Sequence, residues 1–430
     1  MNYQERLLKA IPGGAHTYSR GYDQYPSNAP QILTRGKGAY IYDPQGNKYL
    51  DYGMALRAVN IGYSEDEIDA AAIEQIKNGN NLTRPSMIEL EAAELLVNLI
   101  DSVDMVKFTK NGSTAVSAAV KLARAYTGRD LVARCAEQPF FSYDDWFIGS
   151  TPLNRGIPKD GIENTKLFHY NDIASLEALI AQHPGQLACV VLEPAASEEP
   201  EDGFLHQVQD LCRANGIVFV LDEMITGFRW HIKGAQHTYG VTPDICTFGK
   251  AMANGFAVAC VAGRREIMEL GSIEFEGRER VFLLSTTHGA EMCGLGAFVA
   301  TIGFLQKNKV VEHLWDYGGK LLTMMKSQAE AHGIADNFKV GGIPCSPYYQ
   351  TLDQSGQNSL SLRTLFSQEM IRNGVLFPWI ALSYRHGAEE LAMTERAIDK
   401  AFAVYRQAME QGVEKYLEGP VIKPVFRKFN

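Results

Sequence analysis

Residues 217–250 read IVFVLDEMITGFRWHIKGAQHTYGVTPDICTFGK and contain two short apolar runs that each lead into charge. The first run ends at Asp222, and the second, Ile245–Phe248, is followed by Gly249 and Lys250. An unbroken apolar run between polar turns is typical of a strand covered on both faces, as in a parallel sheet. Ligands bind beyond the carboxyl ends of such strands, so Asp222 and Lys250 are predicted to face one site. A buried ion pair or two unrelated surface charges would give the same pattern.

The composition of the whole chain excludes several classes of partner. The 430 residues include 41 basic and 50 acidic side chains, which gives a net charge of −9 and disfavours nucleic acid and anionic lipid. The N-terminus lacks the layout of a signal peptide, and no apolar run approaches a membrane span, so a cytoplasmic protein is expected. The seven cysteines are scattered through apolar runs, which favours buried free thiols. No metal site is expected, because no histidine lies at ligand spacing from a cysteine and HExxH is absent.

The order of the patterns predicts an α/β fold. We expect a large domain with a mostly parallel sheet flanked by helices, and a smaller α+β domain built from the C-terminus and the N-terminal arm. The expected boundaries are 1–60 for the arm and a small antiparallel meander, 61–308 for the large domain and 309–430 for the small one. Residues 1–30 read as a loop-like arm. Capping boxes at Ser64 and Ser86 predict two early helices.

Three further segments could bind a ligand. Gly112 and Ser113 follow the apolar run at 105–108 and begin a predicted helix, where backbone N–H groups attract an anion. Thr286 lies in a hydroxyl cluster before another helix, and Phe140 lies in an aromatic run after a strand. Each has an ordinary alternative, since hydroxyls cap helices and aromatic pairs fill cores.

Together these groups match one cofactor. A ligand that requires an amine, an acid, a phosphate cradle and a stacking surface is a phosphorylated aromatic aldehyde, and pyridoxal 5′-phosphate (PLP) has these properties. A lysine would bind its aldehyde, an acid would keep its ring nitrogen protonated, and an aromatic side chain would cover its ring.

The same stretches resemble those of class III, fold type I, PLP-dependent aminotransferases. The likeness is carried by LDEMITGFRW (221–230), PDICTFGKAMANGF (243–256) and VAGR (261–264). In the N-terminal half, RLLKAIPGGAHTYSR (6–20), GKGAYIYDPQGNKYLDY (36–52) and VKLARAYTGRD (120–130) resemble glutamate-1-semialdehyde aminomutase and its relatives. The likeness covers nearly the whole chain.

The resemblance implies a role for each matching residue. Lys250 would be the lysine that holds the cofactor and moves the proton, and Asp222 would pair with its ring nitrogen. Gly112 and Ser113 would bind its phosphate. The other implied ligands are Met224 beneath the ring, Phe140 stacked on it, and Thr286, which would reach the phosphate of the neighbouring subunit in a homodimer with shared active sites.

The departures from the aminomutase pattern lie where the family binds its substrate. They are the run Phe140–Tyr143, the run Ala55–Arg57, and Thr114 in place of an acid. Arg20 matches an arginine that the aminomutase uses for its substrate's carboxylate, and Arg57 and Arg385 are further candidate ligands for an acid.

Two segments point to an acceptor. LSTTHGAE (284–291) and ALSYRHGAEE (381–390) resemble a branch of the family associated with surface-polysaccharide sugars. That likeness implies transfer from L-glutamate to 3,8-dideoxy-8-oxo-octulosonate, a sugar acid of lipopolysaccharide amino-sugar biosynthesis. Two alternatives stay open: a glutamate-1-semialdehyde aminomutase, and a non-catalytic regulator that binds PLP.

Overall fold

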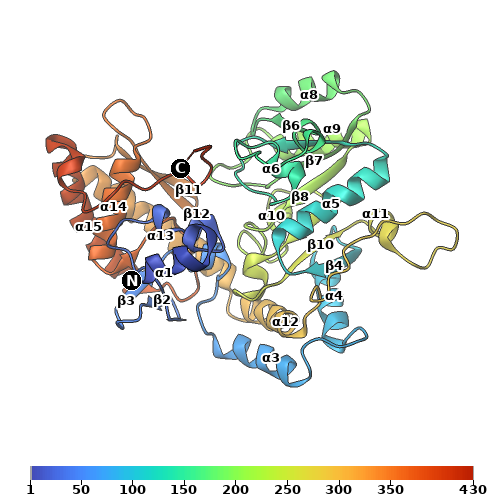
Figure 1. The fold of residues 1–430 in the computed structure, drawn as a ribbon, viewed down its shortest axis with the longest axis horizontal. Helices are drawn as coiled ribbons and strands as arrows, with labels where there is room; N and C mark the ends of the chain where they lie inside the picture. The colour runs from blue at the N-terminus through green and yellow to red at the C-terminus, as the bar shows by residue number, and fades with distance from the viewer. Residues whose placement is uncertain (1, 430) are drawn as a thin grey trace. The chain divides into compact units, whose positions relative to one another are not determined.

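The computed structural model describes residues 2–429, which form two compact units. The first unit combines Met1–Glu65 with Glu312–Arg427, and the second combines Asp66–Val311 with Lys428–Asn430. The second unit contains the large sheet, and the first joins the N-terminal arm to the C-terminal helices (Figure 1). This α/β organisation confirms the predicted fold class.

The second unit is built on a seven-stranded sheet with the order β4-β10-β9-β8-β7-β5-β6. Only β10 runs antiparallel to its neighbours. Consequently the carboxyl ends of the other six strands lie at one edge of the sheet. The strands are β4 (Met105–Thr109), β5 (Leu131–Cys135), β6 (Thr165–Phe168), β7 (Leu187–Leu192), β8 (Val218–Asp222), β9 (Ile245–Phe248) and β10 (Ala259–Gly263).

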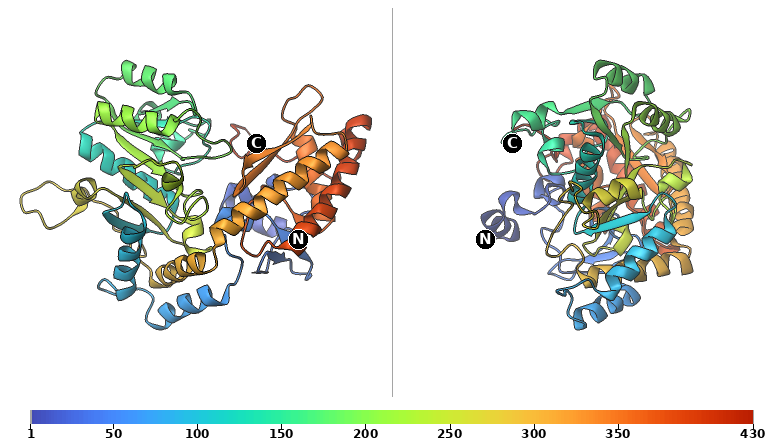
Figure 2. Two further views of the ribbon diagram at one scale, coloured as in Figure 1. Left: turned by 180° about the vertical axis from the view of Figure 1, so that it is seen from behind. Right: turned by 90° about the vertical axis from the view of Figure 1, so that its right-hand side faces the viewer.

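Helices cover both faces of this sheet (Figures 1 and 2). Phe219 and Leu221 of β8 pack in one core cluster with residues of α8 and α9. Val220 and Asp222 alternate with them and therefore face the other side, where α5 packs across the sheet. The helices of this unit are α3 (Asp66–Lys77), α4 (Met87–Leu99), α5 (Gly112–Thr127), α6 (Asp145–Ile148), α7 (Lys159–Glu163), α8 (Ile173–Gln182), α9 (Phe204–Asn215), α10 (Ala235–Thr238), α11 (Arg265–Met268) and α12 (Met292–Lys307).

The first unit contains the predicted meander and three long helices. Its small sheet has the order β1-β2-β3-β13, in which the short strand β13 adds in parallel to β3. The elements are α1 (Tyr3–Ala10), β1 (Arg35–Lys37), β2 (Tyr40–Tyr42), β3 (Lys48–Asp51), α2 (Met54–Arg57), α13 (Val310–Ala331), β11 (Phe338–Ile343), β12 (Ser346–Thr351), α14 (Leu360–Arg372), β13 (Val375–Leu376) and α15 (Ala388–Gln411). The hairpin β11–β12 is the weak strand region that the sequence indicates before the last helices.

Two local predictions are wrong. The arm is not entirely loop, because it contains the helix α1, which begins with a capping box. The Asn2 side chain accepts a hydrogen bond from the backbone N–H of Glu5, and the Glu5 side chain accepts one from the backbone N–H of Asn2. Ser64 does not cap α3, which begins at Asp66. Its φ is 51° and its hydroxyl donates to the carbonyl of Gly36 instead. The cap at Ser86 is confirmed, since its hydroxyl accepts from the N–H of Glu89.

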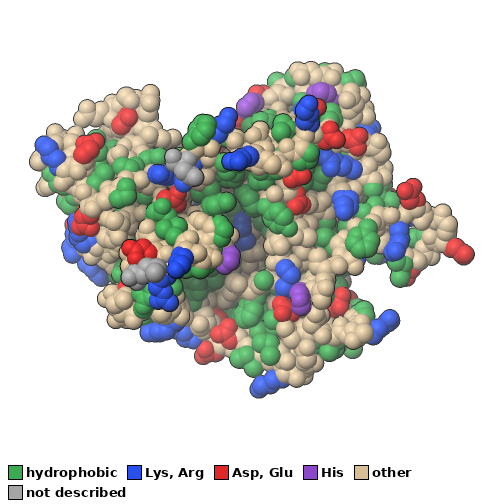
Figure 3. All heavy atoms as spheres, in the orientation of Figure 1, with side chains coloured by type: hydrophobic (Ala, Val, Ile, Leu, Met, Phe, Trp, Pro, Cys, Tyr) green, Lys and Arg blue, Asp and Glu red, His purple; other side chains and the backbone are tan. Residues whose placement is uncertain are grey.

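Part of the second unit exposes large apolar side chains (Figure 3). They lie on α3, on α4, on the segment between these helices, and on the loop that follows α11. They are Ile73, Ile76, Leu82, Met87, Leu90, Ile273, Phe275 and Phe282.

The cysteines lie where the sequence predicts them. Six of the seven in the described chain are buried and Cys293 is half-buried. Burial raises the pKa of Cys135, Cys189 and Cys246 to about 12 in each case, because a thiolate is poorly solvated in the core. These thiols therefore stay protonated near neutral pH.

Adjacent glycines in α13 test the packing of the first unit. A Cβ on Gly318 would lie 1.7 Å from the carbonyl oxygen of Pro344, whereas one on Gly319 would have no heavy atom within 4 Å. We expect Gly318→Ala to lower the free energy of unfolding by about 1–3 kcal/mol or more. Gly319→Ala should raise it by about 0.5–1 kcal/mol, because alanine favours helix. Urea denaturation of both variants measures the difference, and equal effects would contradict the contact.

Candidate active site

Asp222 is a buried carboxylate at the end of β8. It is only 2% exposed, and its Oδ1 accepts hydrogen bonds from the Met224 N–H at 2.9 Å and from Thr247 Oγ1 at 3.1 Å. Burial raises its pKa to about 6, and the Met224 N–H and the Lys250 charge oppose that rise. At neutral pH the Asp222 side chain is therefore mostly ionised, although its pKa lies close to neutral pH.

Lys250 lies just beyond the end of the neighbouring strand. Strands β8 and β9 are parallel, with Asp222 opposite Thr247, so Lys250 follows that pair by three residues. Its φ of 45° lies in the left-handed region, which is unfavourable for a residue with a Cβ. Strain of this kind is concentrated at functional sites, where it fixes the direction of a side chain. Asp222 and Lys250 therefore lie at the same edge of the sheet, at the ends of adjacent parallel strands.

Met224 packs between two glycines at which its side chain leaves no room for a Cβ. A Cβ on Gly112 would lie 2.8 Å from Met224 Sδ, and one on Gly249 would lie 2.6 Å from the same atom. Met224 also shares a small core cluster with Ala115 and Ala259. The thioether thus links the start of α5 to the Lys250 turn.

The start of α5 offers two backbone donors. Asn111 caps the helix by accepting from the N–H and the hydroxyl of Thr114. Within residues 2–429, no group accepts from the N–H of Gly112 or Ser113. These donors point out of the first turn of a 16-residue helix, where an anion is favoured. Thr114, which replaces an acid of the aminomutase pattern, is engaged by the cap.

The loop after β5 is tied to α5 by hydroxyl groups. Ser113 Oγ accepts from the Tyr143 N–H at 3.2 Å, and Ser142 Oγ lies 3.0 Å from Ser117 Oγ. Within this loop Phe141 is buried, whereas Phe140 is 49% exposed. The rings of Phe140 and Phe147 form a T-shaped pair with their centroids 5.7 Å apart.

Thr286 lies in an exposed segment before α12. Its carbonyl accepts from the Gly289 N–H, and its side chain is exposed. A Cβ on Gly289 would lie 2.7 Å from Thr286 Oγ1, so the turn is tight. This segment is joined to the loop of exposed apolar residues after α11.

Two polar residues, Thr247 and Glu223, contribute to this arrangement without having been singled out from the sequence. Thr247 donates a hydrogen bond to Asp222. In the sequence, the signal that could have identified Thr247 is that it is the polar residue inside the apolar run ICTF. Glu223 is fully buried and accepts from Thr226 Oγ1 and from the N–H of Ala235 and Gln236, which folds the loop after β8 back on itself. Nothing in the pattern distinguishes Glu223 from a surface acid.

The three candidate arginines lie in the first unit. Arg20 lines a cavity of about 570 Å³, and no carboxylate of the described residues lies within ion-pair distance of it. Arg57 donates to Ser346 Oγ at 2.9 Å. Arg385 makes a bidentate ion pair with Glu65, at 2.8 and 2.6 Å. The guanidinium of Arg385 is thus committed to a neighbouring carboxylate.

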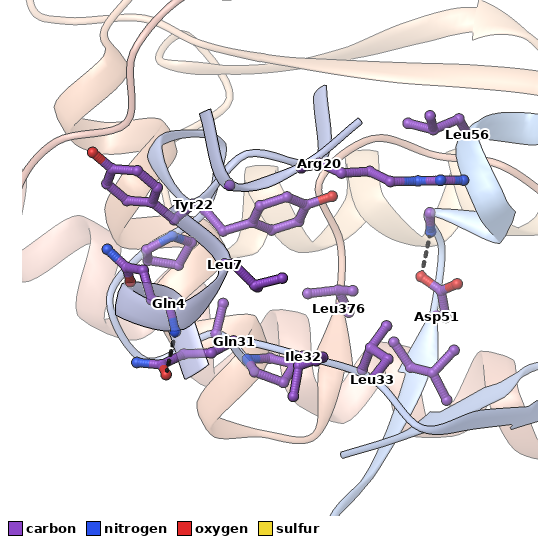
Figure 4. A pocket seen from close by; sticks show the side chains of 18 of the residues that line it. Gln4, Leu7, Arg20, Tyr22, Gln31, Ile32, Leu33, Asp51, Leu56 and Leu376 are labelled. Atoms are coloured by element: carbon purple, nitrogen blue, oxygen red, sulfur yellow. Dashed lines mark hydrogen bonds between the residues drawn. The ribbon is translucent and has the colours of Figure 1, made fainter. Parts of the chain in front are cut away.

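The cavity beside Arg20 has a mainly apolar lining (Figure 4). The side chain of Arg20 extends toward Leu56, while Leu33 and Leu376 lie on the opposite side and Asp51 beneath it (Figure 4). A volume near 570 Å³ suits a small-molecule ligand, and the lining carries one cation, Arg20, and one buried acid, Asp51.

One wall of this cavity is a left-handed turn. The φ angles of Met54, Ala55, Leu56 and Arg57 are 39°, 49°, 63° and 68°, so four successive residues with side chains are left-handed. Each costs about 1–2 kcal/mol relative to a right-handed conformation, which is a large fraction of the stability of a domain. The surrounding contacts must supply that free energy.

The pKa of Asp222 predicts a pH dependence of stability. Its folded pKa of about 6 lies above the ordinary value of 3.8, so the folded apoprotein binds this proton more tightly than the unfolded chain does. The protonated Asp222 side chain therefore contributes its full stabilisation below pH 4. This contribution, about 3 kcal/mol to the free energy of unfolding, is lost as pH rises through 6. Asp222→Asn should remove this pH dependence. The free energy of unfolding of the variant, measured by urea denaturation, should therefore rise relative to that of wild type between pH 4 and pH 7. The exposed Asp145→Asn is the control and should show no such gain.

Comparisons with known proteins agree with this geometry. Residues 21–375 match the family model described as Aminotransferase class-III. A 3-aminobutyryl-CoA aminotransferase of Cloacimonas acidaminovorans (strain Evry) is 32% identical over 419 residues, which are 95% of this chain and 98% of that protein.

Solved structures resemble the chain over nearly its whole length. The FumI protein of a Sphingopyxis species, in its PLP internal aldimine form, is 26% identical with a TM-score of 0.86 and covers 95% of this chain and 97% of its own. A glutamate-1-semialdehyde-aminomutase from Pseudomonas aeruginosa PAO1 shares the fold at 20% identity, with a TM-score of 0.80 and 94% of each chain covered.

The residues at the sheet edge fit PLP: a buried acid, a lysine at the next strand end, and unpaired N–H donors at a helix start. The family match covers most of the chain. The chain belongs to the class III aminotransferases and is a PLP-dependent transaminase.

Proposed function

We propose that Lys250 and Asp222 are the catalytic residues of this transaminase. Lys250 Nζ would hold the aldehyde carbon of PLP and, when the substrate amine has replaced it, move the proton at the substrate carbon. Asp222 would hold a proton on the ring nitrogen. Its pKa of about 6 keeps it ionised near neutral pH, and the added positive charge of the ring nitrogen would lower that pKa further.

The remaining cofactor contacts are assigned from the same arrangement. The N–H groups of Gly112 and Ser113 would bind the phosphate, Met224 would support one face of the ring, and Phe140 would stack on the other. When bound, PLP supplies a ring that withdraws electrons from the bond that breaks at the substrate. The protein determines which bond that is by fixing the orientation of ring and substrate.

We further propose L-glutamate as amino donor and a carbonyl-bearing carboxylic acid as acceptor. Arg20 is the supporting observation, because it lines a cavity without a carboxylate partner among the described residues. The acceptor that the sequence favours is 3,8-dideoxy-8-oxo-octulosonate, whose carboxylate would pair with Arg20. Arg57 and Arg385 are secondary candidates, since Ser346 and Glu65 already engage them.

A 3-oxo acyl compound is the second candidate acceptor. The curated relative at 32% identity acts on 3-aminobutyryl-CoA, and the lining of the cavity beside Arg20 is mainly apolar. An aminomutase reaction ranks lower, because the match to that enzyme is at the level of fold and the chain departs from its pattern at Ala55–Arg57 and Phe140–Tyr143.

A homodimer with shared active sites is part of the proposal. The exposed apolar residues on α3, on α4 and on the loop after α11 form a surface that a second copy would cover. Thr286 is joined to that loop and would reach the phosphate bound by its partner. None of the helices in residues 2–429 is long and apolar enough to cross a membrane.

Replacement of Lys250 tests the catalytic assignment. Wild-type enzyme should show a visible absorbance band of bound PLP that L-glutamate bleaches. Lys250→Ala should lose the band after dialysis and lose turnover by at least about 10³-fold, as expected for a residue that forms and breaks the bond to the cofactor.

A panel of donors followed by a panel of acceptors tests the substrates. If 3-aminobutyrate bleaches the band and glutamate does not, glutamate is the wrong donor. If a 3-oxo acyl thioester turns over and the sugar aldehyde does not, the sugar assignment is wrong. Formation of 5-aminolevulinate from glutamate-1-semialdehyde alone would favour the aminomutase.

Thr286→Val tests the shared site. Loss of a hydroxyl that donates to a phosphate should weaken PLP binding by about 10-fold, since hydrogen bonds to charged groups contribute about 1.5–3 kcal/mol. Sedimentation of wild type should give twice the monomer mass of 47.6 kDa. A monomer with full activity would rule out the shared site, and Thr287→Val is the matched control.

A further inference from the structure

The left-handed turn Met54–Arg57 is held by two side chains that have no place in the cofactor site. Asp51 Oδ1 accepts from the Gly53 N–H at 2.7 Å, and Oδ2 accepts from the Met54 N–H at 3.0 Å. Tyr63 donates its hydroxyl proton to Asp51 Oδ2 at 2.6 Å and accepts from the Ala55 N–H at 2.8 Å. Asp51 and Tyr63 thus bind three successive N–H groups; we name this pair the turn clamp.

Both members of the turn clamp are anchored in regular structure. Asp51 is the last residue of β3 and is only 3% exposed. The backbone of Tyr63 exchanges two hydrogen bonds with Gly38, at 2.9 and 2.8 Å, next to β2. A buried carboxylate is costly unless it is fully hydrogen-bonded, and here its partners are the N–H groups that fix the turn. The clamp therefore transfers the rigidity of the small sheet to a segment that would not adopt this conformation alone.

The turn also determines the shape of the cavity beside Arg20. Ala55 and Leu56 line the cavity together with Asp51 and Tyr63 of the clamp. A residue that relaxed to a right-handed conformation would swing the Leu56 side chain to another direction and change the space next to Arg20. Backbone strain that is stabilised only by specific contacts, at the wall of a ligand-sized cavity, is typical of a functional element.

We propose that Asp51 and Tyr63 are positioning residues that hold the turn Met54–Arg57 so that Ala55 and Leu56 select the acid bound beside Arg20. This inference rests on the proposed function, in which Arg20 binds the substrate's carboxylate. Because both members of the clamp line the cavity beside Arg20, their expected effect is on substrate binding and not on the chemical step.

The test uses the holoenzyme and its half-reaction with L-glutamate, followed by the bleaching of the PLP band. Tyr63→Phe should raise the glutamate concentration at half-maximal rate by about 10-fold, because one charge-assisted hydrogen bond of the clamp is lost and the held conformation becomes less populated. The limiting rate should stay within about twofold and the band should be unchanged.

Tyr40→Phe is the matched control. Tyr40 also donates to a carboxylate, Glu390, at 2.8 Å in the first unit, but it does not line the cavity. Tyr40→Phe should lower the melting temperature about as much as Tyr63→Phe does, and it should leave the half-saturating glutamate concentration unchanged. If Tyr40→Phe and Tyr63→Phe shift that concentration equally, the clamp is only structural and the proposal is overturned.

A glycine substitution supplies the rescue. Glycine adopts a left-handed conformation without steric cost, so Ala55→Gly should compensate for a weakened clamp. In the Tyr63→Phe background it should return the half-saturating concentration to within about threefold of wild type. A well-folded double variant that shows no recovery would contradict the proposal. If wild type does not react with glutamate, the donor assignment fails, and the same variants are compared with the donor found by the panel.

Discussion

The buried charge of Asp222 is the constraint on which the rest of the second unit depends. A carboxylate that is 2% exposed at the end of a central strand needs donors around it, and they come from Thr247 across the β8–β9 pair and from the backbone of Met224. The same turn places Met224 against Gly112 and Gly249, which brings the helix start and the Lys250 turn together. The turn after Asp222 thus connects the end of β8 with the start of α5 and with the Lys250 turn.

Much of this could be predicted from the sequence because the signals are local. The runs that end at Asp222 and at Phe248 predict two strands, and parallel strands share a ligand-binding edge. The helix that begins at Gly112 and Ser113 is predicted from the sequence in the same way. The class III resemblance then adds expected roles for these positions, and the family match confirms the family.

Other features could not be predicted because they depend on distant partners. Ser64 looks like a helix cap, but its hydroxyl finds the carbonyl of Gly36, and Arg385 looks available for an anion, but Glu65 lies beside it. No sequence pattern predicts the four left-handed residues at Met54–Arg57, because none of them is glycine or asparagine. In each case a contact between segments overrides the local preference.

The protonated thiols of the core have a consequence for chemical selectivity. An aldehyde cofactor reacts with thiols as well as with amines, and a thiolate is the reactive form of cysteine. Cys246 and Cys260 lie on β9 and β10, within the sheet that carries the site, yet both are fully buried. Burial raises the pKa of Cys246 to about 12 and also raises that of Cys260. These two thiols can therefore lie in the same sheet as an electrophile without reacting with it, because burial keeps them protonated.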